Sequence, residues 1–150
     1  MAVQLSEIRN IPSSFDRLVA APAHRVFAVF DDPQAGMAAM SDLRSELALT
    51  AEDDVWVFFG DEGSRRLDID GSGHGLHGAV VRTIQKVMSN DLEYLKVLDE
   101  AVRAGYLVMA VRVGDDDIDR AATVLRAHSG RSLARVSHLD YVPIGISGWL

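Results

Sequence analysis

The sequence predicts an α/β (α+β) fold, built as a split β-α-β pair in the ferredoxin-like arrangement, with two helices inserted between the halves. Two segments of the chain each read strand, acidic turn, helix, strand, and they share identities at an offset of 82 residues. The chain between them is long enough for two further helices. The matching residues are Ala28-Val29 with Ala110-Val111, and Ala39, Leu43 and Arg44 with Ala121, Leu125 and Arg126.

The strands expected at 26–30, 55–59 and 107–113 are largely apolar on both alternating faces. Strands of this kind are covered on both sides of their sheet. The two repeat helices can cover one face, so the other face must meet the inserted helices or a partner subunit. The alternative fold is a three-layer, mostly parallel sheet, because every connection is long enough for a crossover.

The first half of the chain carries clear helix signals. Residues 1–23 are expected to form an N-terminal arm, and residues 24–150 a single domain. After the first strand, Asp32 is the expected N-cap of a helix that runs to about Leu47, with Pro33 at its first position. Met40, Leu43 and Leu47 form its inner stripe.

The second half is read in the same way. Apolar residues at helical spacing predict the first inserted helix, and these are Leu76, Val80, Ile84 and Val87. The second inserted helix begins near Asn90 and ends at Gly105 in a left-handed cap. The last helix follows the acidic run 115–117 and closes at Gly130, and the fourth strand covers 133–142.

Composition narrows the function classes. The 150-residue chain has no cysteine, which excludes disulfides, thiolate metal sites and cysteine nucleophiles. Its net charge of −7 argues against general binding to nucleic acids or anionic membranes, since both need basic surface. The N-terminus lacks the pattern of a secretory signal, and no apolar run approaches the ~20 residues of a membrane span. We expect a soluble cytoplasmic protein.

The segment from Gly60 to Met88 concentrates glycine, acidic, arginine and histidine residues. It contains G-x-G-x-x-G at 73–78, but some thirteen residues separate this pattern from the preceding strand, whereas a dinucleotide loop follows its strand directly. A flexible turn that starts a helix is the favoured interpretation. A simple anion site at that helix start remains open, and its candidate ligand-binding residues are Arg65, Arg66, Gly73, His74 and Gly75.

A divalent metal is the other chemistry considered for a loop over Gly60–Gly78. Carboxylate oxygens and imidazole nitrogens are suitable ligands, and the candidates are Asp68, Asp70, His74 and His77. Glu62 is a possible base. A calcium loop is excluded because its twelfth position is Ala79 instead of glutamate. A solvated ion-pair network among Glu62, Arg65, Arg66 and Asp68 is the non-functional alternative.

Outside this segment the sequence supplies no complete catalytic constellation. His24, His128 and His138 are scattered, and we assign them no chemistry. No G-x-S-x-G elbow accompanies the serines.

The central residues resemble a family of small uncharacterised bacterial proteins with the pattern G-x-E-G-x-x-x-L-D-x-x-G-x-x-H-G. Here Gly60, Glu62, Gly63, Leu67, Asp68, Gly71, His74 and Gly75 supply it, followed by Arg82 and Gln85. The chain is also similar to domains labelled general-stress or heat-induced proteins, which share its strand, D-D-P and helix beginning. It departs from the family at Ser132-Leu133 and Tyr141-Val142. The resemblance implies the fold, a cytoplasmic location and a stress association, and brings no activity.

Three hypotheses follow. The first is a non-enzymatic ligand-binding or regulatory domain, and its expected partners are a second copy in a homodimer and a small anion or phosphorylated metabolite. The second is a metal-dependent enzyme with its site between Gly60 and Gly78. The third is a structural domain whose central segment shapes a dimer or partner interface.

Overall fold

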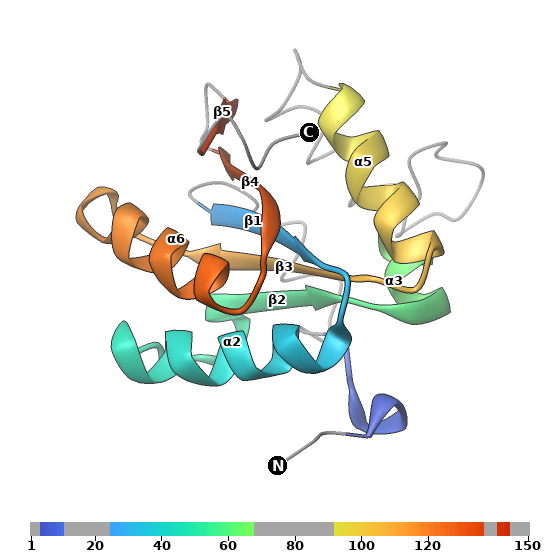
Figure 1. The fold of residues 1–150 in the computed structure, drawn as a ribbon, viewed down its shortest axis with the longest axis horizontal. Helices are drawn as coiled ribbons and strands as arrows, with labels where there is room; N and C mark the ends of the chain where they lie inside the picture. Colours follow the sequence, from blue (N-terminus) through green and yellow to red (C-terminus); the bar gives the residue numbers. More distant parts are fainter. Residues whose placement is uncertain (1–3, 11–24, 68–91, 137–140, 145–150) are drawn as a thin grey trace.

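The computed structural model describes residues 4–10, 25–67, 92–136 and 141–144 (Figure 1). The strands are β1 (Arg25–Phe30), β2 (Val55–Phe58), β3 (Leu107–Arg112), β4 (Arg131–Val136) and β5 (Tyr141–Pro143). The α-helices are α2 (Pro33–Glu46), α3 (Gly60–Leu67), α5 (Leu92–Arg103) and α6 (Ile118–Ala127). Short 3-10 helices are η1 (Leu5–Glu7), η2 (Glu52–Asp54) and η3 (Asp115–Asp117). The helix predicted from Leu76 to Val87 lies outside the described residues.

The strands form one sheet in the order β2-β3-β1-β4-β5, and each neighbouring pair is antiparallel. β3 lies between β1 and β2, while β1 lies between β3 and β4. Each β-α-β unit therefore leaves a gap that a strand of the other unit fills. The α/β class is confirmed, and the alternative of a mostly parallel sheet is wrong because the two units interleave. The strand predicted over 133–142 is also corrected, since β4 and β5 are separate strands that pair with each other.

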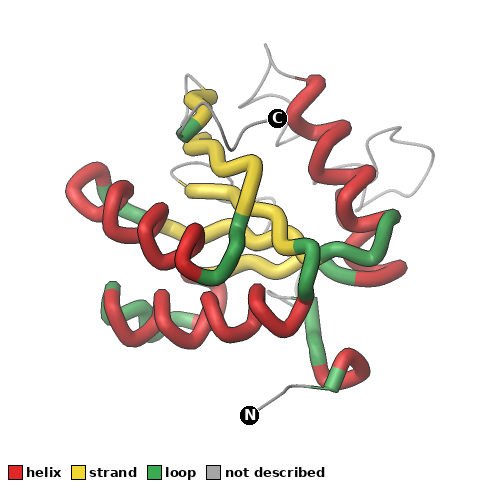
Figure 2. The backbone as a smooth tube through the Cα atoms, viewed as in Figure 1, coloured by secondary structure: helices red, strands yellow, loops and turns green. Residues whose placement is uncertain are grey.

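Both faces of this sheet are buried, as the apolar strands predict. All side chains of β1 and β2 are buried, and β3 is exposed only at Arg112. On one face the strands pack under α2 and α6 (Figure 2), through the inner residues Ala39, Leu43, Ala121 and Leu125. On the other face, Phe27, Trp56 and Phe58 are fully buried, and α5 packs against β3. An inserted helix therefore contributes to the second layer.

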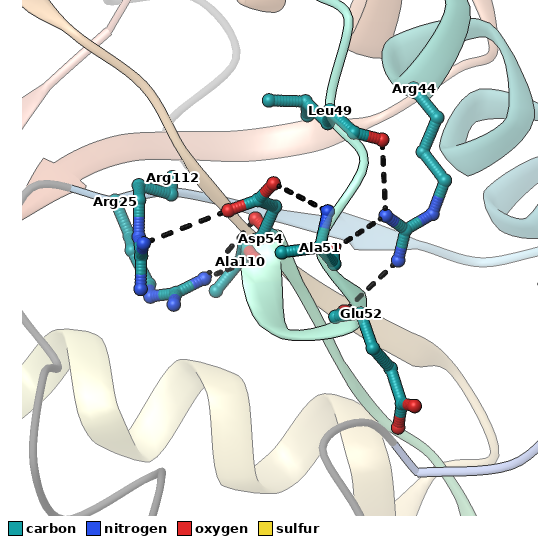
Figure 3. Close-up of polar contacts among 8 residues, drawn as sticks. All are labelled: Arg25, Arg44, Leu49, Ala51, Glu52, Asp54, Ala110 and Arg112. Carbon is teal, nitrogen blue, oxygen red and sulfur yellow. Dashed lines mark hydrogen bonds and ion pairs between the residues drawn. The ribbon is translucent and has the colours of Figure 1, made fainter.

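One charged side chain is buried within the second face. The Arg25 guanidinium lies 3.7 Å from the centroid of the Trp56 ring, and the whole residue is fully buried. Its Nη1 donates to the carbonyls of Asp54 (3.3 Å) and Ala110 (3.4 Å; Figure 3). Arg112 is the cross-strand neighbour of Arg25 and pairs with the Asp54 carboxylate at 3.7 Å. These contacts fix the start of β1 against η2 and β3.

A second arginine holds the connection between α2 and β2. Arg44, in the last turn of α2, donates to three backbone carbonyls, those of Leu49 (3.4 Å), Ala51 (2.8 Å) and Glu52 (3.0 Å; Figure 3). Arg126, its counterpart at the offset of 82, donates from α6 to the carbonyl of Ile144 at 2.8 Å. The repeated arginines therefore each tie the end of a helix to nearby backbone.

The start of α2 confirms the predicted cap. The Asp32 carboxylate accepts a hydrogen bond from the Gln34 N–H at 2.9 Å, and Pro33 is the first helical residue. Gly36 then allows α2 to approach the sheet closely. A Cβ at Gly36 would lie 3.0 Å from the Leu107 side chain.

Three of the described helices end at a residue in the left-handed region. α5 ends at Gly105 (φ +93°), which confirms the predicted cap. α2 ends in the same way at Ala48 (φ 53°) and α6 at Ser129 (φ 67°), although neither residue is a glycine. Gly130, predicted to close α6, is instead the next residue. A Cβ there would lie 2.8 Å from the Leu125 carbonyl oxygen, so Gly130 serves close packing.

The predicted N-terminal arm is described over residues 4–10, where it packs on the domain. Ile8 belongs to the core beneath α2 and α6. The buried Asn10 side chain accepts from the Phe59 N–H (2.9 Å) and donates to the Phe59 carbonyl (3.0 Å). The arm thereby holds the residue that precedes α3.

Replacing Ala48 by glycine should raise the free energy of unfolding by about 1 kcal/mol, because the left-handed conformation is strained for alanine and not for glycine. Ala38→Gly, at an exposed position inside α2, is the control and should lower it by about 1 kcal/mol. Urea unfolding measures both. Equal destabilisation by the two substitutions would contradict the assigned geometry of Ala48.

Removing the Arg44 side chain should lower the unfolding free energy by about 2 kcal/mol, since three carbonyls lose a charged donor. Arg120→Ala provides a matched comparison, because that arginine is 59% exposed and its nearest carboxylate oxygen is 3.8 Å away. Arg120→Ala should change the unfolding free energy by no more than about 0.5 kcal/mol. A similar decrease in unfolding free energy for both variants would refute the structural role of Arg44.

Candidate functional site

A groove of about 330 Å³ opens between α2 and α6, which lie side by side and antiparallel on one face of the sheet (Figure 1). Two carboxylates from α2 line it, and the α6 side supplies a guanidinium, a hydroxyl, an imidazole and two apolar side chains. The lining residues are Asp42, Glu46, Arg120, Thr123, Val124, Ala127 and His128. The opposite faces of both helices are buried in the core, so the packing of the fold positions the groove.

Asp42 and His128 join the two helices across the groove. Nε2 of His128 lies 2.6 Å from Oδ2 of Asp42, and the two side chains are 24% and 57% exposed. His128 is the C-cap residue of α6. The hydrogen bond fixes the orientation of the imidazole ring and of the carboxylate. Within the part of the chain that the structure describes, the second oxygen of Asp42 has no hydrogen-bond partner, so it can accept from a ligand.

Glu46 lies one turn beyond Asp42 on α2, at the last residue of the helix. Among the described residues its exposed carboxylate makes no hydrogen bond or ion pair. The repeat explains why. At the offset of 82, Asp42 corresponds to Val124 and Glu46 to His128, so Val124 and Glu46 hold the positions equivalent to the hydrogen-bonded pair. Valine cannot pair with a carboxylate, and Glu46 therefore remains available at the groove.

The remaining polar groups of the groove are held within α6. Arg120 lies 3.8 Å from Asp117, and the Thr123 hydroxyl donates to the Asp119 carbonyl at 2.8 Å. The threonine proton is thus directed at the helix backbone and not at His128. Over the described ranges, no group of three histidine, aspartate or glutamate side chains is placed to hold a metal ion. The groove is equipped to bind a ligand by charge and hydrogen bonding.

The predicted loop over Gly60–Gly78 is wrong in its first part, because Gly60–Leu67 is the helix α3. Gly60 adopts φ +72° where the chain turns into the helix. A Cβ at Gly63 would lie 2.8 Å from the Phe58 carbonyl carbon, so this glycine allows α3 to pack on the end of β2. These two glycines therefore serve helix entry and packing, where the sequence pattern indicated a loop.

The sequence-predicted site residues are described only in part. Arg65 and Arg66 lie on α3, and their side chains are outside the description. Glu62, the possible base, lies 3.4 Å from the Asn10 amide nitrogen, which donates to it. The other candidates lie outside the described residues, so their roles stay predictions. These are Asp68, Asp70, Gly73, His74, Gly75 and His77.

A second groove, of about 410 Å³, lies between α3 and α5. Its lining consists of Gly60, Asp61, Ser64, Val102, Arg103 and Gly105. Arg103 is engaged by Asp99 of the same helix at 2.8 Å. This groove includes the start of the predicted central segment, but its charged lining groups are Arg103, which Asp99 engages, and Asp61 in the acidic first turn of α3.

Sequence reasoning did not assign a role to His128 or Asp42, which are 86 residues apart. No local motif joins them. The repeat contained a signal that could have drawn attention to His128, because at the offset of 82 this residue is equivalent to Glu46 and both stand at the end of a helix.

Comparisons of the chain with family models, with curated proteins and with solved structures found no match. In the described part of the chain, no helix has the length and apolar character needed to cross a membrane.

A double-mutant cycle tests whether the fold needs the pair across the groove. Asp42→Ala and His128→Ala should each lower the unfolding free energy by less than about 1 kcal/mol, with a coupling of about 0.5 kcal/mol, as for exposed ion pairs. Chemical denaturation of the two single variants and the double variant gives the coupling. A coupling above about 2 kcal/mol would mark the pair as structural.

Proposed function

We propose that this protein is a non-enzymatic, cytoplasmic small-ligand-binding domain whose ligand occupies the groove between α2 and α6. The observation that carries the proposal is the orientation of Asp42 by His128 beside the available carboxylate of Glu46. A ligand there would contact both repeats, because one wall of the groove comes from each. Its binding would therefore favour one arrangement of the two helices, which is the basis for a regulatory role.

Binding is favoured over catalysis by the chemistry of the same groove. A histidine oriented by a carboxylate serves acid–base catalysis when a nucleophile or a reacting group lies beside it. Here the hydroxyl of Thr123 donates to the helix backbone. The described residues thus support recognition of a ligand more directly than its chemical conversion.

The other hypotheses from the sequence stay predictions. The metal site at Asp68, Asp70, His74 and His77 is tested by metal analysis of freshly purified protein. The homodimer receives no support from an apolar patch among the described residues, where Leu5 is the exposed large apolar side chain. The stress association rests on the family resemblance alone.

A thermal-shift screen of small polar metabolites tests the proposed groove. A ligand at 100 times its Kd should raise Tm by ~5 °C or more. Ala127→Trp fills the groove and should abolish the shift, whereas Ala38→Trp, exposed on α2 outside the groove, should preserve it. Ligands whose shift survives Ala127→Trp unchanged would show that the site lies elsewhere.

A further inference from the structure

We propose that the ligand of the α2–α6 groove carries a protonated amine, which binds between the carboxylates of Asp42 and Glu46. The inference rests on the proposed function of the groove and names the chemical class that the groove selects.

The placement of Glu46 opposes the stability of its own helix. Glu46 is the last residue of α2, where the helix dipole favours cations over anions. Asp42 precedes it by one turn, and like charges at this spacing repel each other. Arg120 lines the same groove, but among the described residues no cation lies within ion-pair distance of Glu46. Residues that break local rules without a structural gain are expected at functional sites. A bound cation removes both unfavourable terms.

The polar and apolar groups that line the groove suit an alkylammonium ion. His128 holds one oxygen of Asp42 at 2.6 Å and leaves the other oxygen for a ligand, while Glu46 contributes a whole carboxylate. An ammonium group has three donors and can therefore engage both residues together. Val124 and Ala127 line the groove with apolar surface against which a short alkyl chain can pack.

The charges of the groove disfavour an anion. Against the two α2 carboxylates the lining offers the guanidinium of Arg120, which lies 3.8 Å from Asp117 on its own helix. His128 is hydrogen-bonded to Asp42. A phosphate or carboxylate in the groove would meet repulsion from Asp42 and Glu46. The anionic ligand predicted from the sequence therefore does not suit this site.

Two probes of equal length and opposite charge test the inference, namely n-butylammonium and butyrate, with n-butanol as the uncharged control. Amide chemical shifts of ¹⁵N-labelled protein are followed during titration at constant ionic strength. Butylammonium should move the amides of residues 42–46 and 120–128, and butyrate should not. Glu46→Gln should weaken butylammonium binding about tenfold. Glu100→Gln, an exposed carboxylate on α5, should leave the affinity unchanged.

The outcomes separate the two proposals. If butyrate or butanol moves the groove amides as strongly as butylammonium, the groove is a binding site and the inference about the amine is wrong. If none of the three probes moves these amides, the groove itself is refuted as the site. Equal weakening by Glu46→Gln and Glu100→Gln would reduce the effect to net charge and overturn the inference.

Discussion

Burial of both sheet faces is the constraint on which the rest of this structure depends. The side chains of β1 and β2 alternate between two apolar layers, so neither face can remain in water. The interleaved strand order places both repeat helices on one face, where α2 and α6 become antiparallel neighbours. The other face accommodates a buried guanidinium at Arg25 through the Trp56 ring and two carbonyls. The groove is a consequence of this arrangement.

Differences between the two halves of the internal repeat determine which polar groups of the groove are available to a ligand. If the two halves had the same sequence, the positions equivalent to a pair across the groove would carry the same residues and could form a second pair. One contact is the hydrogen-bonded pair of Asp42 and His128. The equivalent positions are held by Val124 and Glu46, which both line the groove and cannot form such a hydrogen bond. The divergence of the two halves therefore leaves one carboxylate available at the point where the repeats meet, and it is this asymmetry that supports a ligand.

The sequence predicted the fold well where short-range signals and burial agree. The D-D-P turn before α2, the apolar strands and Gly105 all act locally, and each has the expected place. The errors have physical causes as well. Gly60 and Gly63 resembled loop glycines, yet the first turns the chain into α3 and the second allows that helix to pack on β2. Gly130 resembled a cap, while Ser129 takes the left-handed position.

The candidate site was much less predictable, because Asp42 and His128 meet only through tertiary packing of helices far apart in the chain. No residue spacing encodes such a contact, and an acidic residue on an exposed helix face is usually solvated. The folded helices bring Asp42, Glu46 and His128 to one groove, where Glu46 lacks the hydrogen-bond partner that its counterpart His128 has in Asp42.

The unfolding free energy of Glu46→Gln without ligand tests most directly the claim that this carboxylate serves binding at the expense of the fold. We expect the substitution to raise the unfolding free energy by about 0.5 kcal/mol, because the helix dipole and Asp42 both disfavour a negative charge there. A loss of stability in Glu46→Gln would contradict it and assign Glu46 to the support of the structure.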